Sequence, residues 1–290
     1  MFNTIQSVRN EIITDLLKVY DKNDAVSLSY FLLMHVTGFS KVVLLANPNS
    51  ILDDDLVATV FSYVARLKNK EPYQQILGYT EFYNLKFNIT PDVLIPRPET
   101  EELVDLVLKK FNKSEQPYVI IDVGTGSGCI AISLQHHLKN SELYALDISN
   151  KAIEVARKNA LINNVKISFF EYDVLKSGAE TEFYFLSKKV DAIVSNPPYV
   201  KESERGLMDD IVLNFEPDNA IFVSDGDPLV FYRNIAKMGL TLLKPGGWLF
   251  FEINENLHRE MVHLVEALGY KNVEIVKDLF GKWRILHCRL

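Results

Sequence analysis

The chain has 290 residues, 48% of them hydrophobic, which suits two domains or one large α/β domain with an extension. Its formal net charge is −7, and residues 1–70 hold equal numbers of acidic and basic residues, so the whole acidic excess follows residue 70. An acidic second part weighs against a nucleic-acid partner without excluding one, because nucleic-acid affinity relies on many lysine and arginine contacts.

The apolar runs are too short to cross a bilayer, and residues 1–17 mix charges with apolar residues, unlike a signal peptide. We therefore expect a soluble, cytoplasmic protein with no membrane partner. The only cysteines, Cys129 and Cys288, have neither a metal-ligand spacing nor a disulfide framework, so we expect no metal site.

Residues 4–69 show helical periodicity, with apolar residues three or four positions apart at Ile5, Val8, Ile12, Leu16 and Val19. A second helix is predicted to end at Gly38, and a third to begin near Asp53, where acidic residues favour a helix N-terminus. We predict a small helical domain over residues 1–75, which is either a packed bundle or a docking domain for a partner.

A β-hairpin linker is predicted over residues 76–97, followed by a helix from Pro98 to about Phe111 and a catalytic domain over residues 98–290. Strand-like runs then alternate with helical ones. The runs are residues 118–123, 143–147, 166–172, 190–195, 248–253, 272–277 and 284–288. This alternation predicts an α/β domain with a seven-stranded, mostly parallel sheet and helices on both faces.

The first of these runs ends in a glycine-rich turn that leads into a helix. After Asp122 and Val123 come Gly124, Thr125, Gly126, Ser127 and Gly128. A dinucleotide fingerprint, GxGxxG, would require glycine at Cys129, so a dinucleotide cofactor is disfavoured. An acidic residue before the first glycine suits a cationic group, such as the amino-acid end of S-adenosylmethionine (SAM).

Two further aspartates end the next strands. Asp147 lies where a carboxylate accepts hydrogen bonds from ribose hydroxyls, and Asp173 is placed to accept from an adenine amino group. Taken singly, each also suits a solvated strand end or a helix cap, with Ser149 as a competing cap. Together with the glycine turn they predict a nucleoside cofactor at the carboxyl ends of the strands.

The fourth strand is followed by Asn196, Pro197, Pro198 and Tyr199. Asn-Pro and Pro-Pro pairs commonly mark turns, which is the plain interpretation. The prolines also remove two backbone donors, so the carbonyls of Asn196 and Pro197 are free to face a ligand beside the Asn196 side-chain oxygen. The position at the end of a buried strand makes the tetrapeptide a candidate active site.

The glycine turn, Asp147, Asp173 and the Asn-Pro-Pro-Tyr segment resemble the motifs of SAM-dependent methyltransferases that modify a planar NH₂ group on adenine, guanine or glutamine. Three further segments resemble the peptide-chain release factor glutamine methyltransferases, the PrmC/HemK family. These are residues 71–78 with Glu81 and Phe82, residues 95–101, and residues 215–217. The resemblance runs from about residue 71 to the C-terminus, whereas the helical domain matches only in size and helicity.

The resemblance implies a Rossmann-like domain, SAM as cofactor and bacterial class I release factors as partners. The reaction it implies is methylation of the glutamine N5 in the Gly-Gly-Gln motif, which modulates translation termination. It also places Val174 beside the adenine, where some members have an aromatic residue, and Asn254 stands where many have glycine. Arg97 and Glu99 are either an ion pair at a linker or residues that close the substrate site.

The residues also suggest a mechanism. An amide nitrogen is a feeble nucleophile because its lone pair is delocalised. The Asn196 side-chain oxygen and the Pro197 carbonyl are expected to accept both NH₂ hydrogens and aim the nitrogen at the SAM methyl group, with Tyr199 packed against the amide.

Three alternatives remain open. A nucleic-acid amino-methyltransferase, acting on adenine N6 or guanine N2, would use the same tetrapeptide on a flipped base, but the chain lacks an evident basic groove or target-reading domain. A catalytically silent SAM-binding adaptor would not need both the glycine turn and the Asn-Pro-Pro-Tyr segment to be intact. A hydride-transfer enzyme would bind NAD.

Overall fold

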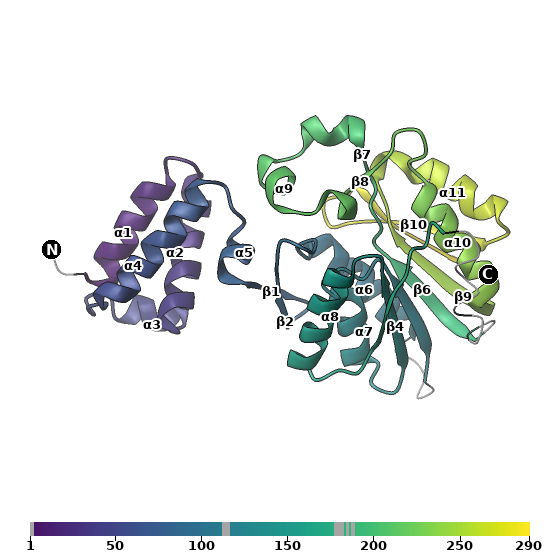
Figure 1. The fold of residues 1–290 in the computed structure, drawn as a ribbon, viewed down its shortest axis with the longest axis horizontal. Coiled ribbons are helices and arrows are strands. Elements are labelled where there is room, and N and C mark those ends of the chain that lie inside the picture. The colour runs from purple at the N-terminus through teal and green to yellow at the C-terminus, as the bar shows by residue number, and fades with distance from the viewer. Residues whose placement is uncertain (1–2, 112–116, 177–182, 184–185, 187–188) are drawn as a thin grey trace. The chain divides into compact units, whose positions relative to one another are not determined.

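The computed structural model describes residues 3–111, 117–176, 183, 186 and 189–290. The chain forms two compact units, which are residues 1–78 with 210–215, and residues 79–209 with 216–290 (Figure 1). Among the described residues, no helix is long and apolar enough to cross a membrane.

The first unit is helical, as predicted. Its main helices are α1 (Ile5–Leu16), α2 (Lys22–Thr37) and α4 (Asp54–Lys68), and their apolar stripes form one core. Thr4 and Asp21 cap the first two, each accepting a hydrogen bond from a backbone N–H three residues on. The periodicity did not predict two short helices, α3 (Lys41–Ala46) and α5 (Tyr73–Leu77), because each spans fewer than two turns.

The second unit begins with the predicted hairpin, formed by β1 (Tyr79–Phe82) and β2 (Leu85–Asn88). Asn159 fastens it to the domain, since its side chain accepts from the Asn88 N–H at 2.7 Å and donates to the Asn88 carbonyl at 3.1 Å. Helix α6 (Pro98–Phe111) follows with the predicted bounds.

The seven-stranded sheet has the order β10-β11-β9-β6-β3-β4-β5. Its strands are β3 (Val119–Val123), β4 (Glu142–Asp147), β5 (Ser168–Glu171), β6 (Val190–Ser195), β9 (Leu243–Glu252), β10 (Lys271–Lys277) and β11 (Trp283–Arg289). Each strand overlaps one of the predicted runs, although β9 begins at Leu243, before its predicted run of residues 248–253. Only β11 runs against the others, so the prediction of a mostly parallel sheet is confirmed.

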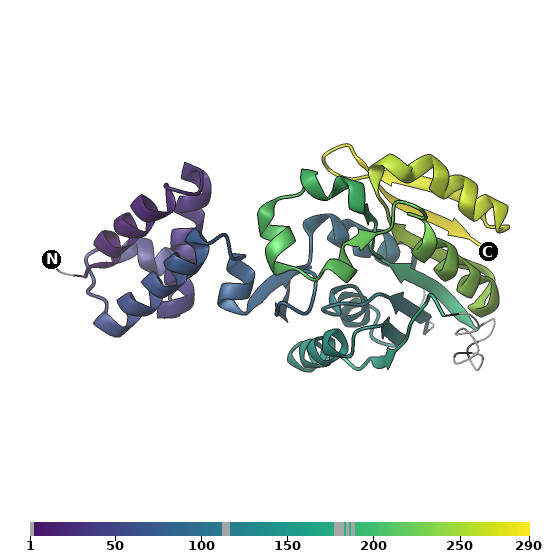
Figure 2. The ribbon, with the colours of Figure 1, turned by 45° about the horizontal axis from the view of Figure 1, so that its top comes forward.

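Helices cover both faces of this sheet (Figures 1 and 2). The helices α6, α7 (Cys129–His137) and α8 (Asn150–Ile162) pack on one face, and α10 (Val230–Leu242) and α11 (His258–Ala267) pack on the other. Neighbouring strand residues divide between the two cores, since Ile120 and Phe250 face the first group whereas Ile121 and Phe251 face the second. This is the period-two alternation of a strand buried on both sides.

Several short elements follow β6 along the chain. They are β7 (Val200–Lys201), η2 (Glu202–Leu207), α9 (Asp210–Phe215), η3 (Asp218–Ala220) and β8 (Phe222–Val223), with η4 (Glu255–Leu257) after β9. They are too short to carry a periodic signal. The Arg205 guanidinium braces η2 against η3 through Asp218 and lies over the Phe222 ring.

Candidate active site

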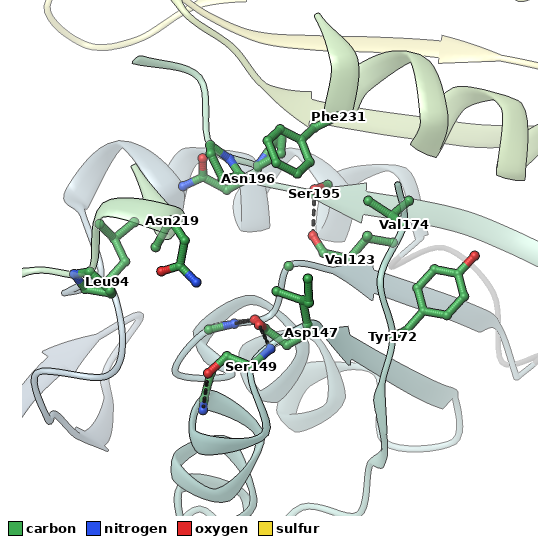
Figure 3. Close-up of a pocket in the computed structure, with 18 of the residues that line it drawn as sticks. Leu94, Val123, Asp147, Ser149, Tyr172, Val174, Ser195, Asn196, Asn219 and Phe231 are labelled. Carbon is green, nitrogen blue, oxygen red and sulfur yellow. Dashed lines mark hydrogen bonds between the residues drawn. The ribbon is translucent and has the colours of Figure 1, made fainter. Parts of the chain in front are cut away.

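A cavity opens at the carboxyl edge of the sheet, where the ends of β3, β4 and β6 meet the segment after β5. The rest of the wall is formed by residues 92–94, by Pro217, Asn219 and Ala220, and by Phe231 and Ile235 of α10. Figure 3 shows Asn196 and Phe231 on one side and Asp147 with Ser149 across from them. The cavity therefore brings together the ends of all four strands that the sequence marked as functional.

The glycine turn lines this cavity at Gly124 and Gly126. The Gly124 and Thr125 N–H groups donate to the Leu146 carbonyl, and the Gly126 N–H donates to Asp147 Oδ2 at 2.8 Å. A Cβ added at Gly124 or Gly126 would meet no atom within 4 Å. The backbone is thus open to a ligand at both positions, as the sequence predicted.

Asp122 lies behind the turn, fully buried and outside the cavity lining. Its Oδ2 accepts hydrogen bonds from the Thr125 hydroxyl at 2.7 Å and the Ala131 N–H at 3.2 Å. Its Oδ1 has no hydrogen-bond partner among the described residues, and burial raises the pKa of this carboxyl to about 7. Thr125, Ser127 and Gly128 also stay outside the lining and shape the turn instead.

Asp147 and Asp173 both line the cavity. Asp147 Oδ1 accepts from the Ser149 N–H at 2.9 Å, and the partly buried carboxyl has a raised pKa because burial outweighs these hydrogen bonds. Asp147 Oδ1 and Oδ2 each accept a backbone hydrogen bond, and the second lone pair of a carboxylate oxygen suits a ligand hydroxyl. Asp173 Oδ1 accepts from the Leu175 N–H at 3.0 Å.

The remaining wall is largely apolar. Val174 lies on the same side of the cavity as Tyr172, and Phe231 faces the cavity from α10 (Figure 3). Sequence reasoning missed Phe231, Leu94 and Asn219. The last two adjoin segments that the sequence had marked, residues 95–101 and 215–217, whereas Phe231 carried no local signal.

These features fit SAM. The open glycine backbone accepts a small polar chain, the unpaired oxygen of Asp122 next to the turn suits a nearby cationic group, and Asp147 retains acceptor capacity for a ribose. Among the described residues, no group of three histidine, cysteine, aspartate or glutamate side chains is placed to hold a metal ion.

Asn196 lines the cavity at the end of β6, where the buried Ser195 hydroxyl ties that strand to the Val123 carbonyl at 2.6 Å. Asn196 Nδ2 donates to Thr100 Oγ1 at 3.2 Å, and the Thr100 hydroxyl donates to Glu252 Oε2 at 2.7 Å. The side-chain oxygen of Asn196 is therefore left as the acceptor for a ligand. Neither Thr100 nor Glu252 was predicted as a functional residue.

Comparison with known proteins identifies the family. The methyltransferase small domain family matches residues 101–216, and the PrmC N-terminal domain family matches residues 11–78. A release factor glutamine methyltransferase of Flavobacterium psychrophilum is 39% identical over 97% of this chain and 98% of its own length. The chain belongs to the release factor glutamine methyltransferases. The Bacteroides thetaiotaomicron member is 41% identical over 92% of this chain and 94% of its own.

Solved structures support the fold. A methyltransferase from Pyrococcus furiosus aligns with a TM-score of 0.50 at 19% identity, covering 82% of this chain and 98% of its own. The hMettl16 catalytic domain, solved with an RNA hairpin, aligns with a TM-score of 0.54 at 16% identity, covering 84% of each chain. At these identities the likeness concerns the methyltransferase fold alone.

In the structure, the side chains of Tyr199 and Arg97 bind partners other than the ones that the sequence suggested. The Tyr199 hydroxyl donates to Glu252 Oε1 at 3.1 Å, burial raises the pKa of this tyrosine, and the residue lies outside the cavity lining. Arg97 forms its ion pair with the buried Glu216 rather than with Glu99, and Glu216 also accepts from the Ile95 N–H at 2.9 Å. Neither Arg97 nor Glu99 lines the cavity.

Asn254, which the sequence resemblance had marked as a departure from the family pattern, makes three hydrogen bonds with neighbouring segments. Its Nδ2 donates to the Tyr199 carbonyl at 3.2 Å and to Glu204 Oε2 at 3.0 Å, and its Oδ1 accepts from the Asn256 N–H. The side chain therefore fastens the end of the Asn-Pro-Pro-Tyr segment to η4 and η2.

Proposed function

We propose that this protein transfers the methyl group of SAM to the side-chain amide nitrogen of the glutamine in the Gly-Gly-Gln motif of class I release factors. The observation that carries the proposal is the Asn196 amide at the cavity edge, in a chain whose near full-length relatives are named for this activity. The alternative, a nucleic-acid amino-methyltransferase, has no comparable support, because the RNA-bound relative shares only the fold.

The proposed roles follow from hydrogen-bonding capacity. The Asn196 side-chain oxygen and the Pro197 carbonyl accept the two hydrogens of the substrate NH₂, which orients the nitrogen. When bound, SAM would supply a methyl group whose bond to the positively charged sulfur breaks, which leaves a neutral thioether. The substrate nitrogen would form a bond to that methyl group and lose one proton to water, so no buried base is required. We assign Gly124, Gly126, Asp147, Asp173 and Val174, which line the cavity, to direct cofactor binding. Asp122, Thr125, Ser127 and Gly128 would support the cofactor site by holding the glycine turn in place.

We also propose a division into a docking domain (residues 1–75), a hairpin linker (76–97) and a catalytic domain (98–290). The compact unit of residues 1–78 and the match of the PrmC N-terminal domain family support a separate helical part. We place the reaction in the cytoplasm, where release factors meet ribosomes, and expect no nucleic-acid or membrane partner.

The test is mass spectrometry of purified class I release factors, and of total DNA and RNA, after incubation with the protein and methyl-labelled SAM. One methyl group on the Gly-Gly-Gln glutamine, absent from a factor with glutamine replaced by alanine, is the expected result. Label on nucleic acid alone would overturn the proposal in favour of a base methyltransferase.

A further inference from the structure

We infer that Thr100 and Glu252 are positioning residues that determine which end of the Asn196 amide faces the substrate. The three residues, which we call the amide relay, form one chain of hydrogen bonds from Asn196 through Thr100 to Glu252. The inference rests on the proposed function, because it assigns a role in presenting the acceptor to a substrate NH₂ group.

Which group donates in each hydrogen bond of the relay follows from the number of protons that each side chain carries. A carboxylate only accepts, so Glu252 takes the single hydroxyl proton of Thr100 at 2.7 Å and that of Tyr199 at 3.1 Å, one on each oxygen. Having donated its only proton, Thr100 Oγ1 is left as an acceptor. It therefore selects the NH₂ end of Asn196, at 3.2 Å, and leaves the oxygen end for the cavity.

Burial makes this choice strict. Thr100 is 2% exposed and Glu252 is 1% exposed, so water does not compete for the bonds between them. In the reversed orientation the Asn196 NH₂ group would face the NH₂ group of the substrate, two donors without an acceptor. An asparagine amide has nearly the same shape in both orientations, so packing alone does not select one.

Burial has the largest effect on the Glu252 carboxyl and raises its pKa, and the charge of Glu99 acts in the same direction. The hydrogen bonds from the Thr100 and Tyr199 hydroxyls and the guanidinium of Arg284 oppose this shift, because each of them favours the carboxylate. The Glu252 backbone carbonyl also accepts from the buried Tyr232 hydroxyl at 3.0 Å, which fixes the strand end that carries the carboxylate.

The relay is tested with four variants, measuring kcat for release-factor methylation, the Kd for SAM by calorimetry, and the melting temperature. Thr100→Val keeps the shape but removes the hydroxyl, and Thr100→Ser keeps the hydroxyl. Glu252→Gln keeps the shape but leaves one acceptor oxygen where the carboxylate has two, so the Thr100 and Tyr199 hydroxyls compete for it. Thr80→Val is the matched control, because Thr80 is also buried but lies in the hairpin, outside the relay.

We expect Thr100→Val and Glu252→Gln to lower kcat by about 100-fold, the usual effect of losing one oriented hydrogen bond in an active site. The Kd for SAM should change by less than about threefold, and Thr100→Ser should retain kcat within about fivefold. Thr80→Val should leave both constants unchanged.

The relay is refuted if Thr100→Val and Thr100→Ser behave alike, if Glu252→Gln retains kcat, or if kcat and SAM affinity fall together. If the Thr100→Val variant melts near the assay temperature, its kcat is not used. The kcat values of Glu252→Gln and Thr100→Ser are then compared, and this comparison tests the relay. Failure of the wild-type protein to methylate release factors would instead contradict the proposed function, so the two failures are distinguishable.

Discussion

Two glycines of the same turn are expected to respond to alanine in different ways. Gly124 and Gly128 have φ values of +75° and +84°, so alanine costs about 1–2 kcal/mol of backbone strain at either. At Gly128 the new Cβ would also lie 2.8 Å from Ile132 Cδ1 and 3.1 Å from Ala156 Cβ. Overpacking of this kind costs about 1–3 kcal/mol, so Gly128→Ala should lose roughly 2–5 kcal/mol of unfolding free energy.

Gly124→Ala is the matched control, because its Cβ meets no atom within 4 Å and enters space beside the cavity. It should lose only about 1–2 kcal/mol of stability but weaken SAM binding by about tenfold or more, since the methyl group occupies room the ligand needs.

Urea unfolding followed by tryptophan fluorescence measures the first effect, and calorimetry with SAM measures the second. Both tryptophans, Trp248 and Trp283, lie in the catalytic unit, so the fluorescence reports on that unit alone. The reasoning fails if the two variants unfold at the same urea concentration, or if Gly124→Ala binds SAM as tightly as the wild type.

Three further outcomes are expected. Asn196→Ala should abolish methylation while SAM binding measured by calorimetry stays nearly intact; loss of both would make Asn196 a structural residue. Because burial raises the pKa of Asp122 from 3.8 to about 7, the folded state binds its proton more tightly than the unfolded state, so stability without SAM should fall as pH rises from about 4 to 7. Asp122→Asn should flatten that part of a melting-temperature profile, and an unchanged slope would assign it to other groups. Arg97→Ala should destabilise by about 2–3 kcal/mol, because it leaves the buried Glu216 carboxylate without its ion pair, and adding Glu216→Gln should recover part of that loss in urea unfolding.

Much of the fold could be predicted because its signals are local. Each strand of the large sheet is a short apolar run between turns, and α6 begins at a proline and ends after an apolar stripe. Helices shorter than two turns, such as α3 and α5, were missed because so few residues carry no readable period.

The sequence by itself determined the parts of the site that follow from strand ends: the glycine turn, Asp147, Asp173 and Asn196. Parallel strands present their carboxyl ends at one edge, so residues at those ends converge whatever the loops do. Only the tertiary structure determined which side chains form hydrogen bonds and ion pairs with one another. Thr100 and Glu252 are 152 positions apart, Arg97 and Glu216 are 119 apart, and the buried Asp122 lies behind the glycine turn, outside the cavity lining. Such pairs depend on how loops and helix ends pack around the sheet edge, and neither hydrophobic period nor motif spacing encodes that packing.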